Sequence, residues 1–357
     1  MLARRCTLDH RHAGKVDLPL MVPAFSSKGF NFLAAKDGKK KRPYSELSNL
    51  LADFAAYQAT SVLVSAYDLH FRHLVPPDAR PRTVTSSLRN VRLVFIDSGG
   101  YELTRDFDST ETKVFGYEPR DGFGLPEYER VLAETNKKSR DIHCVAANFD
   151  TENRGVPLRE QIVRGRNLFR KFPAYSADFI IKPFGSDKNT IDVASLSRTD
   201  FRNLAGFDII GVTEKELGTK LIDRLRNIAL LRRGLDEEGI HAPIHVWGGL
   251  DPVLSPLMFF SGAQIFDGVS WLRYAFREGR AINLDSNIVL DEKIGITVPF
   301  DQSRALTRID NLRFLDNLSI SLQQWVDYDG TNFDMFHHSV RDRLKQGYSV
   351  MVTKKII

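Results

Sequence analysis

The sequence predicts an α/β fold, most specifically a (β/α)8 TIM barrel. Short, continuously apolar and β-branched segments recur along the chain, which is typical of parallel strands covered on both faces. Segments with apolar residues at helical spacing separate them, and this alternation indicates βα units. A doubly wound open sheet is the alternative. The eight expected strands span 18–25, 61–67, 92–97, 143–150, 178–185, 206–212, 243–249 and 264–270.

The intervening helices follow from the spacing of apolar residues and from their terminal residues. Pro252 lies near the start of one helix, where its missing N–H group is tolerated. Gly234 is a typical helix end and is expected to terminate another. The clearest expected helices span 45–59, 158–172, 220–234 and 251–262.

The 357 residues are expected to form one domain, 1–357, with a barrel at about 18–280 and a C-terminal helical elaboration at about 281–357. A hydrophobic fraction of 42% and a charged fraction of 27% are ordinary for a soluble globular protein. No segment approaches the roughly 20 apolar residues of a membrane span, and the first residues contain no signal-peptide core. We therefore expect a cytoplasmic protein without a membrane partner.

The two cysteines and the net charge limit the chemistry. Cys6 and Cys144 are far apart and form no C-x-x-C pair, so neither a cysteine zinc site nor a disulfide framework is expected. The formal net charge of +5 permits a polyanionic partner without requiring one.

Three of the expected strands end in a carboxylate: Asp97, Asp150 and Asp267. The carboxyl ends of the strands of a parallel barrel converge on one face, so these acids are expected to meet. A pair of carboxylates suits chemistry at a sugar anomeric carbon, where one attacks and the other moves a proton. The alternative is that each aspartate caps the turn or helix that follows it.

Several segments resemble the tRNA-guanine transglycosylases. "FIDSGGYEL" (95–103) resembles the DSGGY/F motif of that family, and "GLDPVLSPLMFFSGAQIFDGVSWLR" (249–273) resembles a second motif at the eighth strand. The likeness keeps the family's order and runs from about residue 18 to about residue 347. Further segments that carry it are "LMVPAFSSKGF", "VLVSAYDLHFR", "VAANFD" and "DNLRFLDNL".

The resemblance implies roles for individual residues. Asp267 falls on the family's nucleophile, which attacks C1′ of the nucleoside and expels guanine. Asp97 falls on the second carboxylate, which handles protons and helps to hold the base. Tyr101 falls on the aromatic residue that stacks on the purine, and Asp150 on the acid that accepts base N–H groups. Arg273 matches an arginine that meets nucleic-acid phosphate.

Further substrate contacts follow from the same resemblance. Ser98 and Gly99 of the first motif and Gly211 of the sixth strand are expected to line the base pocket. Arg80 and Arg82 are expected to join Arg273 at the phosphate backbone. The basic run within 36–43 is either part of that surface or a solvated loop.

The sequence also departs from the family's pattern. The stretch 280–306 contains no cysteine, so the family's zinc subdomain is absent and no metal site is expected. Phe184 stands where the family has a glutamine after the fifth strand, and it is expected to contact the substrate at that position. Ser65 replaces the asparagine of "NTYHL", and Glu102 follows Tyr101 where the family has glutamine. These changes predict altered base recognition beside a retained pair of acids.

Asp68, His70 and His73 have the residue types of metal ligands, but their spacing in one loop is unspecific. We therefore add no metal site on their account.

The function implied is that of a pentosyltransferase that replaces guanine in a polynucleotide with a 7-deazaguanine such as preQ0 or preQ1. The reaction proceeds through a covalent Asp267 intermediate and needs no cofactor. DNA is favoured over tRNA because the zinc subdomain is missing and the pocket is altered. The alternatives are a standard tRNA-guanine transglycosylase of queuosine or archaeosine biosynthesis, a non-catalytic nucleic-acid-binding partner and a nucleoside hydrolase. A homodimer and a partner subunit both stay open.

Overall fold

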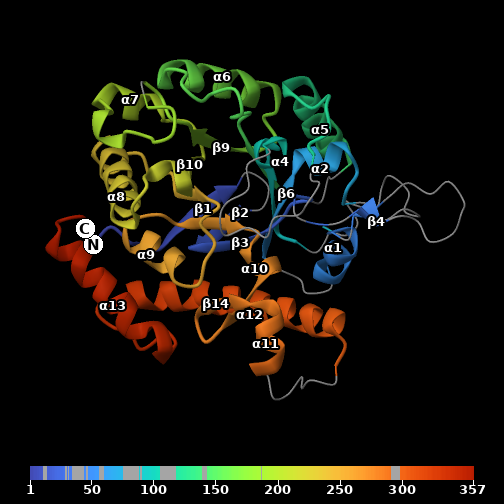
Figure 1. Cartoon of the computed structure of the whole chain (residues 1–357). Helices are drawn as coiled ribbons and strands as arrows, with labels where there is room; N and C mark the ends of the chain where they lie inside the picture. Colours follow the sequence, from blue (N-terminus) through green and yellow to red (C-terminus); the bar gives the residue numbers. More distant parts are fainter. Residues whose placement is uncertain are drawn as a thin grey trace, which may run out of the picture.

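The computed structural model of the chain contains a closed barrel of eight parallel strands surrounded by helices (Figure 1). Neighbouring strands follow the order of the sequence, and the last strand closes the barrel by pairing with the first through Asp267 and Val22. The prediction of a (β/α)8 barrel is therefore confirmed. The residues that the structure describes are 1–10, 14–28, 30, 32–33, 44–45, 47–55, 60–74, 88, 91–104, 118–138, 143–185, 187–290 and 298–357.

The barrel strands coincide with the eight predicted segments and are mostly shorter. The fourth ends at Ala147, so Asp150 lies in the loop after the strand and not at its last position. The strands are β3 (Leu20–Phe25), β6 (Ser61–Ser65), β7 (Leu93–Asp97), β8 (Cys144–Ala147), β9 (Ser176–Ile181), β10 (Ile209–Thr213), β11 (Ile244–Trp247) and β12 (Ile265–Gly268).

The connecting helices cover the outside of the barrel (Figure 1). Their amphipathic faces pack against the outward side chains of the strands, as the apolar spacing predicts. They are α1 (Leu47–Ala55), α2 (Ala66–His70), α4 (Gly100–Leu103), α5 (Leu125–Lys138), α6 (Leu158–Lys171), α7 (Arg198–Asn203), α8 (Leu221–Glu237), α9 (Leu254–Phe260) and α10 (Ser270–Arg273), with 3₁₀ turns at η1 (Val193–Ser195) and η2 (Glu214–Leu217).

Gly234 does not end its helix, and this prediction is wrong. α8 continues to Glu237, and Gly234 lies inside it. A Cβ atom at this position would lie 2.1 Å from Cζ of Phe201, on α7. The glycine therefore permits the close approach of two neighbouring helices.

An N-terminal hairpin, β1 (Cys6–His10) and β2 (Gly14–Leu18), was not predicted. Its apolar side chains join the core inside the barrel, and Nε2 of His10 lies 3.0 Å from the carbonyl oxygen of Cys144, at the start of β8. The hairpin thus closes the end of the barrel opposite to the strand C-termini. The buried core that it completes contains Leu8, Val16, Leu18, Leu20, Val22, Ala24, Leu63, Leu93, Phe95, Val145, Ala147, Ile180, Ile209, Trp247 and Ile265.

The C-terminal segment is helical and packs on the barrel, as predicted. Asn311 of α12 attaches it, because its Nδ2 donates to the carbonyl oxygens of Trp271 and Tyr274, each at 2.7 Å. The chain ends lie close together in Figure 1. No helix in the described part of the chain is both long and apolar enough to cross a membrane. The remaining elements are β4 (Phe32–Leu33), β5 (Tyr44–Ser45), β13 (Tyr274–Arg277), β14 (Arg280–Asn283), α11 (Leu284–Leu290), α12 (Phe300–Asp327) and α13 (His338–Thr353).

Candidate functional site

The strand alternation directs a set of polar side chains into the mouth of the barrel. Successive side chains of a strand point to opposite faces, and apolar residues such as Phe95 and Ile180 belong to the core inside the barrel. The residues two positions along therefore face the inside as well, which places Asp97 and Lys182 there. By the same count the inward-facing polar residues in the C-terminal halves of the strands, or just after them, include Ser65, Asp97, Lys182, Thr213 and Asp267, with Asp178 and His245 further inside.

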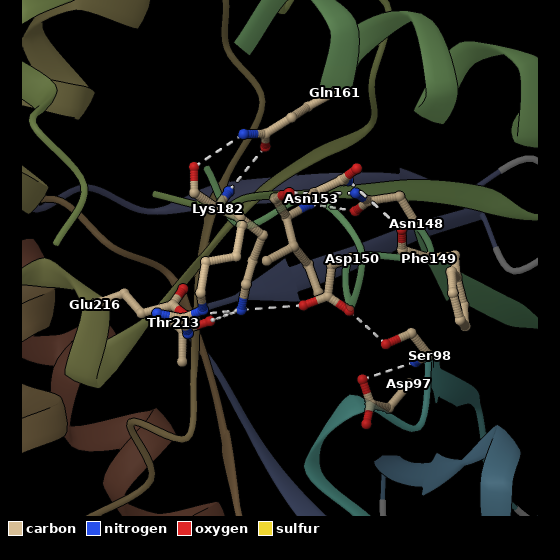
Figure 2. Close-up of polar contacts among 12 residues, drawn as sticks. Asp97, Ser98, Asn148, Phe149, Asp150, Asn153, Gln161, Lys182, Thr213 and Glu216 are labelled. Atoms are coloured by element: carbon tan, nitrogen blue, oxygen red, sulfur yellow. Dashed lines mark hydrogen bonds and ion pairs between the residues drawn. The ribbon is translucent and has the colours of Figure 1, made fainter. Parts of the chain in front are cut away.

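The "DSGG" turn joins the third strand to the loop of Asp150 (Figure 2). The N–H group of Ser98 donates to Oδ1 of Asp97 at 2.7 Å, and Oγ of Ser98 donates to Oδ1 of Asp150 at 2.5 Å. One serine therefore holds two carboxylates of the expected site in fixed positions.

The two glycines behind Ser98 allow this turn to pack closely. Gly99 has a φ of 89°, a left-handed conformation that favours glycine. A Cβ atom there would lie 2.9 Å from Cβ of Tyr67 and 2.9 Å from Cε1 of Phe123. A Cβ atom at Gly100 would lie 3.1 Å from Oγ1 of Thr151. The Gly-Gly pair thus lets the backbone fit between the loops after the second and fourth strands.

Asp97 lies in an environment that disfavours its charge. Burial, followed by repulsion from the carboxylates of Asp150 and Asp267, raises the pKa of Asp97 to about 7. Hydrogen bonds from the N–H groups of Gly99 and Ser98 oppose this rise. A carboxyl group with such a pKa can both give and accept a proton near neutral pH.

Lys182 links Asp150 to a second acid. Its Nζ lies 3.1 Å from Oδ2 of Asp150 and 3.0 Å from Oε1 of Glu216, and it donates to Oγ1 of Thr213 at 3.2 Å (Figure 2). Arg154 also pairs with Glu216. Burial lowers the pKa of Lys182, but the two carboxylates outweigh this effect and raise it overall. Lys182 is therefore a buried cation on one wall of the site.

Asp267 lies on the opposite side of the mouth and is held through one oxygen. The N–H group of Gly248 donates to Oδ1 of Asp267 at 3.0 Å, and Nε2 of His245 lies 3.2 Å from the same oxygen. Nδ1 of His245 lies 2.6 Å from Oδ2 of Asp178. The side chains of Asp178 and His245 are fully buried.

The trio of Asp178, His245 and Asp267 retains a proton at neutral pH. Burial disfavours the charged imidazole, but Asp178 and then Asp267 outweigh it and raise the pKa of His245 to about 9. Burial also raises the pKa of Asp178. Both shifts keep a proton on the pair, and we assign it to His245 because two carboxylates flank the imidazole.

Gly211 makes room for this buried pair. It lies on β10 between β9 and β11 and is paired in register with His245. A Cβ atom at Gly211 would lie 2.7 Å from Oδ1 of Asp178 and 2.7 Å from Nε1 of Trp247. The structure therefore gives this glycine a packing role beneath the mouth; its role in a base pocket stays a prediction.

Tyr101 lies in a cluster with two basic residues. Nζ of Lys28 lies 4.4 Å from the centre of the Tyr101 ring and donates to the Tyr101 carbonyl oxygen at 3.2 Å. Nη2 of Arg273 donates to the carbonyl oxygen of Lys28 at 3.0 Å and to the Tyr101 hydroxyl at 3.3 Å. Tyr101 and Arg273 are thus in contact, which the sequence does not predict.

Glu102 and Ser65 also meet. Oγ of Ser65 donates to Oε2 of Glu102 at 2.7 Å, and Ser26 donates to Oε1. Burial, followed by repulsion from Asp68 and Asp97, raises the pKa of Glu102 to about 8. Ser65 and Glu102, which both differ from the transglycosylase pattern, are therefore hydrogen-bonded to each other.

The structure does not bring every predicted residue into these contacts. Phe184 is half-buried and packs against the apolar core outside the barrel, whereas Lys182 contacts Asp150. Arg80, Arg82 and the basic run of 36–43 lie outside the described residues. The roles given to all these residues stay predictions.

The described residues offer little to a metal ion. Among them, His, Cys, Asp and Glu side chains form no group of three or more that could hold one. Asp68 and His73 pair with each other, with Nδ1 of His73 2.8 Å from Oδ1 of Asp68. These two side chains are therefore hydrogen-bonded partners of each other.

Sequence reasoning missed Asp178, Lys182, His245 and Glu216. The first three carried a signal, because each is a charged or titratable residue inside an otherwise apolar strand segment. Glu216 had no such signal, because a glutamate in a polar segment is just as typical of an exposed turn. No model of a known protein family matches the chain, and no curated protein sequence matches it.

Proposed function

We propose that the protein is a pentosyltransferase that exchanges guanine in a polynucleotide for a 7-deazaguanine, with Asp267 as the nucleophile and Asp97 as the proton-transfer group. The observation that carries this proposal is that Asp97, at the end of β7, and Asp267, near the end of β12, both face the inside of the barrel at its mouth. The charge of Asp267 contributes to the raised pKa of Asp97, so the two groups share one electrostatic site. Two carboxylates in unlike environments are the arrangement that separates an acid from a nucleophile.

The environments fit the two roles. Asp267 accepts from the Gly248 N–H group and lies beside the protonated His245, and these are contacts that a negatively charged carboxylate makes. Asp97, with a pKa of about 7, exists in both protonation states near neutral pH. In the first half-reaction a carboxylate oxygen of Asp267 attacks C1′, the C1′–N9 bond breaks, and protonated Asp97 supplies a proton to the departing guanine.

The second half-reaction reverses the first with a different base. Asp97 removes the N9 proton of the incoming 7-deazaguanine, N9 attacks C1′, and the carboxylate of Asp267 leaves. Asp150 is the acceptor that we propose for the N–H edge of the base. One of its oxygens accepts from Ser98 and the other contacts Lys182, and each can accept a further hydrogen bond. No electrons are gained or lost, so no redox cofactor is required.

The substrate we favour is DNA, ahead of tRNA, in the cytoplasm. A base within a duplex must leave the stack to reach Asp267, which costs a few kcal/mol. Single-stranded or looped substrate should therefore react faster than intact duplex. Arg273, which is half-buried beside Tyr101, supplies positive charge next to the site for the phosphate backbone.

The test is exchange of labelled guanine on single-stranded DNA, duplex DNA, tRNA and free guanosine at one salt concentration, with wild type, Asp267→Ala and Asp97→Asn. We expect exchange on a polynucleotide and none with Asp267→Ala, and we expect both variants to remain folded. Equal reaction of free guanosine and every polymer would favour a nucleoside enzyme. Tight nucleic-acid binding without exchange would favour a non-catalytic partner.

A further inference from the structure

Three ionisable residues, Asp178, His245 and Asp267, form a chain of contacts that leads from the inside of the barrel to its mouth. Asp178 comes from β9 and His245 from β11, and the two meet across β10 because Gly211 has no side chain between them. Asp267, on β12, is the only one of the three to which the proposed function gives a role.

This chain of charges has no evident packing purpose. The neighbouring inward-facing positions hold Ile180, Ile209 and Ile265, which fill the barrel with apolar side chains. Burying a carboxylate and an imidazolium costs several kcal/mol per ion unless their contacts compensate, and apolar residues of similar volume often serve stability equally well. The pair is therefore best explained by what it contacts, which is Asp267.

The two oxygens of Asp267 are not equivalent. Among the described residues, the two polar contacts of the Asp267 side chain are made by Oδ1, with the Gly248 N–H group at 3.0 Å and with Nε2 of His245 at 3.2 Å. An oxygen that accepts a hydrogen bond and lies beside a charged imidazole is a weaker nucleophile than its partner on the same carboxylate. Bond formation to a substrate would therefore use Oδ2.

We propose that Asp178 and His245 are positioning residues that fix Oδ1 of Asp267, so that Oδ2 attacks C1′ and the covalent intermediate is returned efficiently to free carboxylate. The proposal rests on the proposed function. In the intermediate, Oδ2 is the ester oxygen and Oδ1 the carbonyl oxygen. When N9 of the incoming base attacks C1′, the C1′–Oδ2 bond breaks and its electron pair returns to Asp267. The positive charge of His245 stabilises the negative charge that returns to Asp267. The proton of the imidazole is shared by Asp178 and His245 and is not transferred in this step.

The groups that face His245 set its charge. Asp178 flanks it from β9 and Asp267 from β12. The rings of Phe95, on β7, and Trp247, on its own strand, complete its surroundings at centroid distances of 5.4 Å and 4.4 Å. The two carboxylates outweigh the effect of burial and hold the imidazole charged well above neutral pH, in keeping with its pKa of about 9.

The decisive variant is the double substitution D178N/H245Q, which removes both charges but can keep a chain of hydrogen bonds. The introduced asparagine amide can donate to the side-chain carbonyl oxygen of the introduced glutamine, and the glutamine amide can donate to Oδ1 of Asp267. The matched control is H73Q, in the other buried His–Asp pair, whose side chains are 4% and 0% exposed. Thermal unfolding of both variants shows how much of any effect is structural.

The assay follows the covalent complex between the protein and single-stranded DNA, looped tRNA or duplex DNA, with formation and breakdown timed separately by denaturing gel and mass spectrometry. For D178N/H245Q we expect breakdown to slow by about 100–1,000-fold, because the positive charge that stabilises the departing carboxylate is removed, so that the complex accumulates. The H73Q variant should keep the wild-type ratio of formation to breakdown. The His245 ring should titrate near pH 9 by NMR in wild type and at lower pH in D267N.

The outcomes separate the two proposals. If wild type forms the complex and D178N/H245Q breaks it down at the wild-type rate, the pair is structural and this inference is wrong while the proposed function stands. If His245 is neutral at about pH 7, the inference is wrong as well. If wild type forms no complex with any of the polynucleotides, the proposed function is overturned and the inference with it.

Discussion

Replacing Lys182 with methionine should destabilise the protein far more than removal of an exposed lysine. Methionine keeps most of the length of the side chain but removes the cation that lies 3.1 Å from Asp150 and 3.0 Å from Glu216. These three side chains are only 11%, 11% and 6% exposed, so water can replace little of the lost interaction. Loss of one partner from a buried ion pair typically costs about 3–5 kcal/mol, because the other charge is left buried.

The matched control is K171M. Lys171 forms an ion pair of 2.6 Å with Glu129, but the lysine side chain is 56% exposed, and exposed pairs contribute roughly 0–1 kcal/mol. Urea unfolding followed by tryptophan fluorescence and far-ultraviolet circular dichroism would compare the two variants with wild type. Adding D150N to K182M should recover part of the loss, because the unpaired carboxylate is removed. If K182M and K171M unfold at the same urea concentration, the assignment of a buried, paired cation to this wall is wrong.

Three further predictions address other parts of the molecule. The pKa of Asp97 is about 7 in the folded protein and close to 4 in the unfolded chain. Between these pH values the folded protein keeps a proton that the unfolded chain loses. The free energy of unfolding therefore falls as the pH rises from about 4 to 7. D97N should raise the melting temperature relative to wild type more at about pH 8 than at about pH 4, and an equal shift at both would contradict the raised pKa. G234A should destabilise the protein by about 1–3 kcal/mol, although alanine favours helices, because its Cβ atom would lie 2.1 Å from the Phe201 ring. G347A is the control: the nearest atom to its Cβ would be a methyl carbon of Leu257 at 2.8 Å, on a flexible side chain, and it should cost less stability in the same melts. Metal analysis of the purified protein should find no stoichiometric zinc, and one tightly held zinc per chain would refute this expectation.

The barrel could be predicted because its strands are short, apolar and regularly separated by helical patterns. The N-terminal hairpin could not, since Cys6–His10 and Gly14–Leu18 alternate apolar and polar residues over only five positions each. The prediction that Gly234 ends its helix was wrong because the sequence does not distinguish such a glycine from one that makes room for a neighbouring ring. Only the position of Phe201 in space distinguishes them.

The candidate site was predicted in part for a related reason. Asp97, Asp150 and Asp267 could be identified because each lies within a few residues of the end of an apolar strand segment. Lys182 and His245 lie within such segments, and their charged state depends on partners far away in the sequence. Spacing along one strand cannot reveal a contact that crosses a neighbouring strand, as the contact of His245 with Asp178 does.

Because Ser65 and Glu102 are in contact, the effect of a substitution at one of these positions depends on the residue at the other. Both side chains are almost completely buried, and the serine hydroxyl donates to the glutamate carboxyl at 2.7 Å. A larger amide at position 65 alone would have to fit beside the carboxyl, and an amide at position 102 alone would alter what the hydroxyls of Ser26 and Ser65 face. Contacting residues of this kind show non-additive effects of about 0.5–3 kcal/mol. The combined effect on stability of asparagine at position 65 and glutamine at position 102 should therefore differ from the sum of the two single effects.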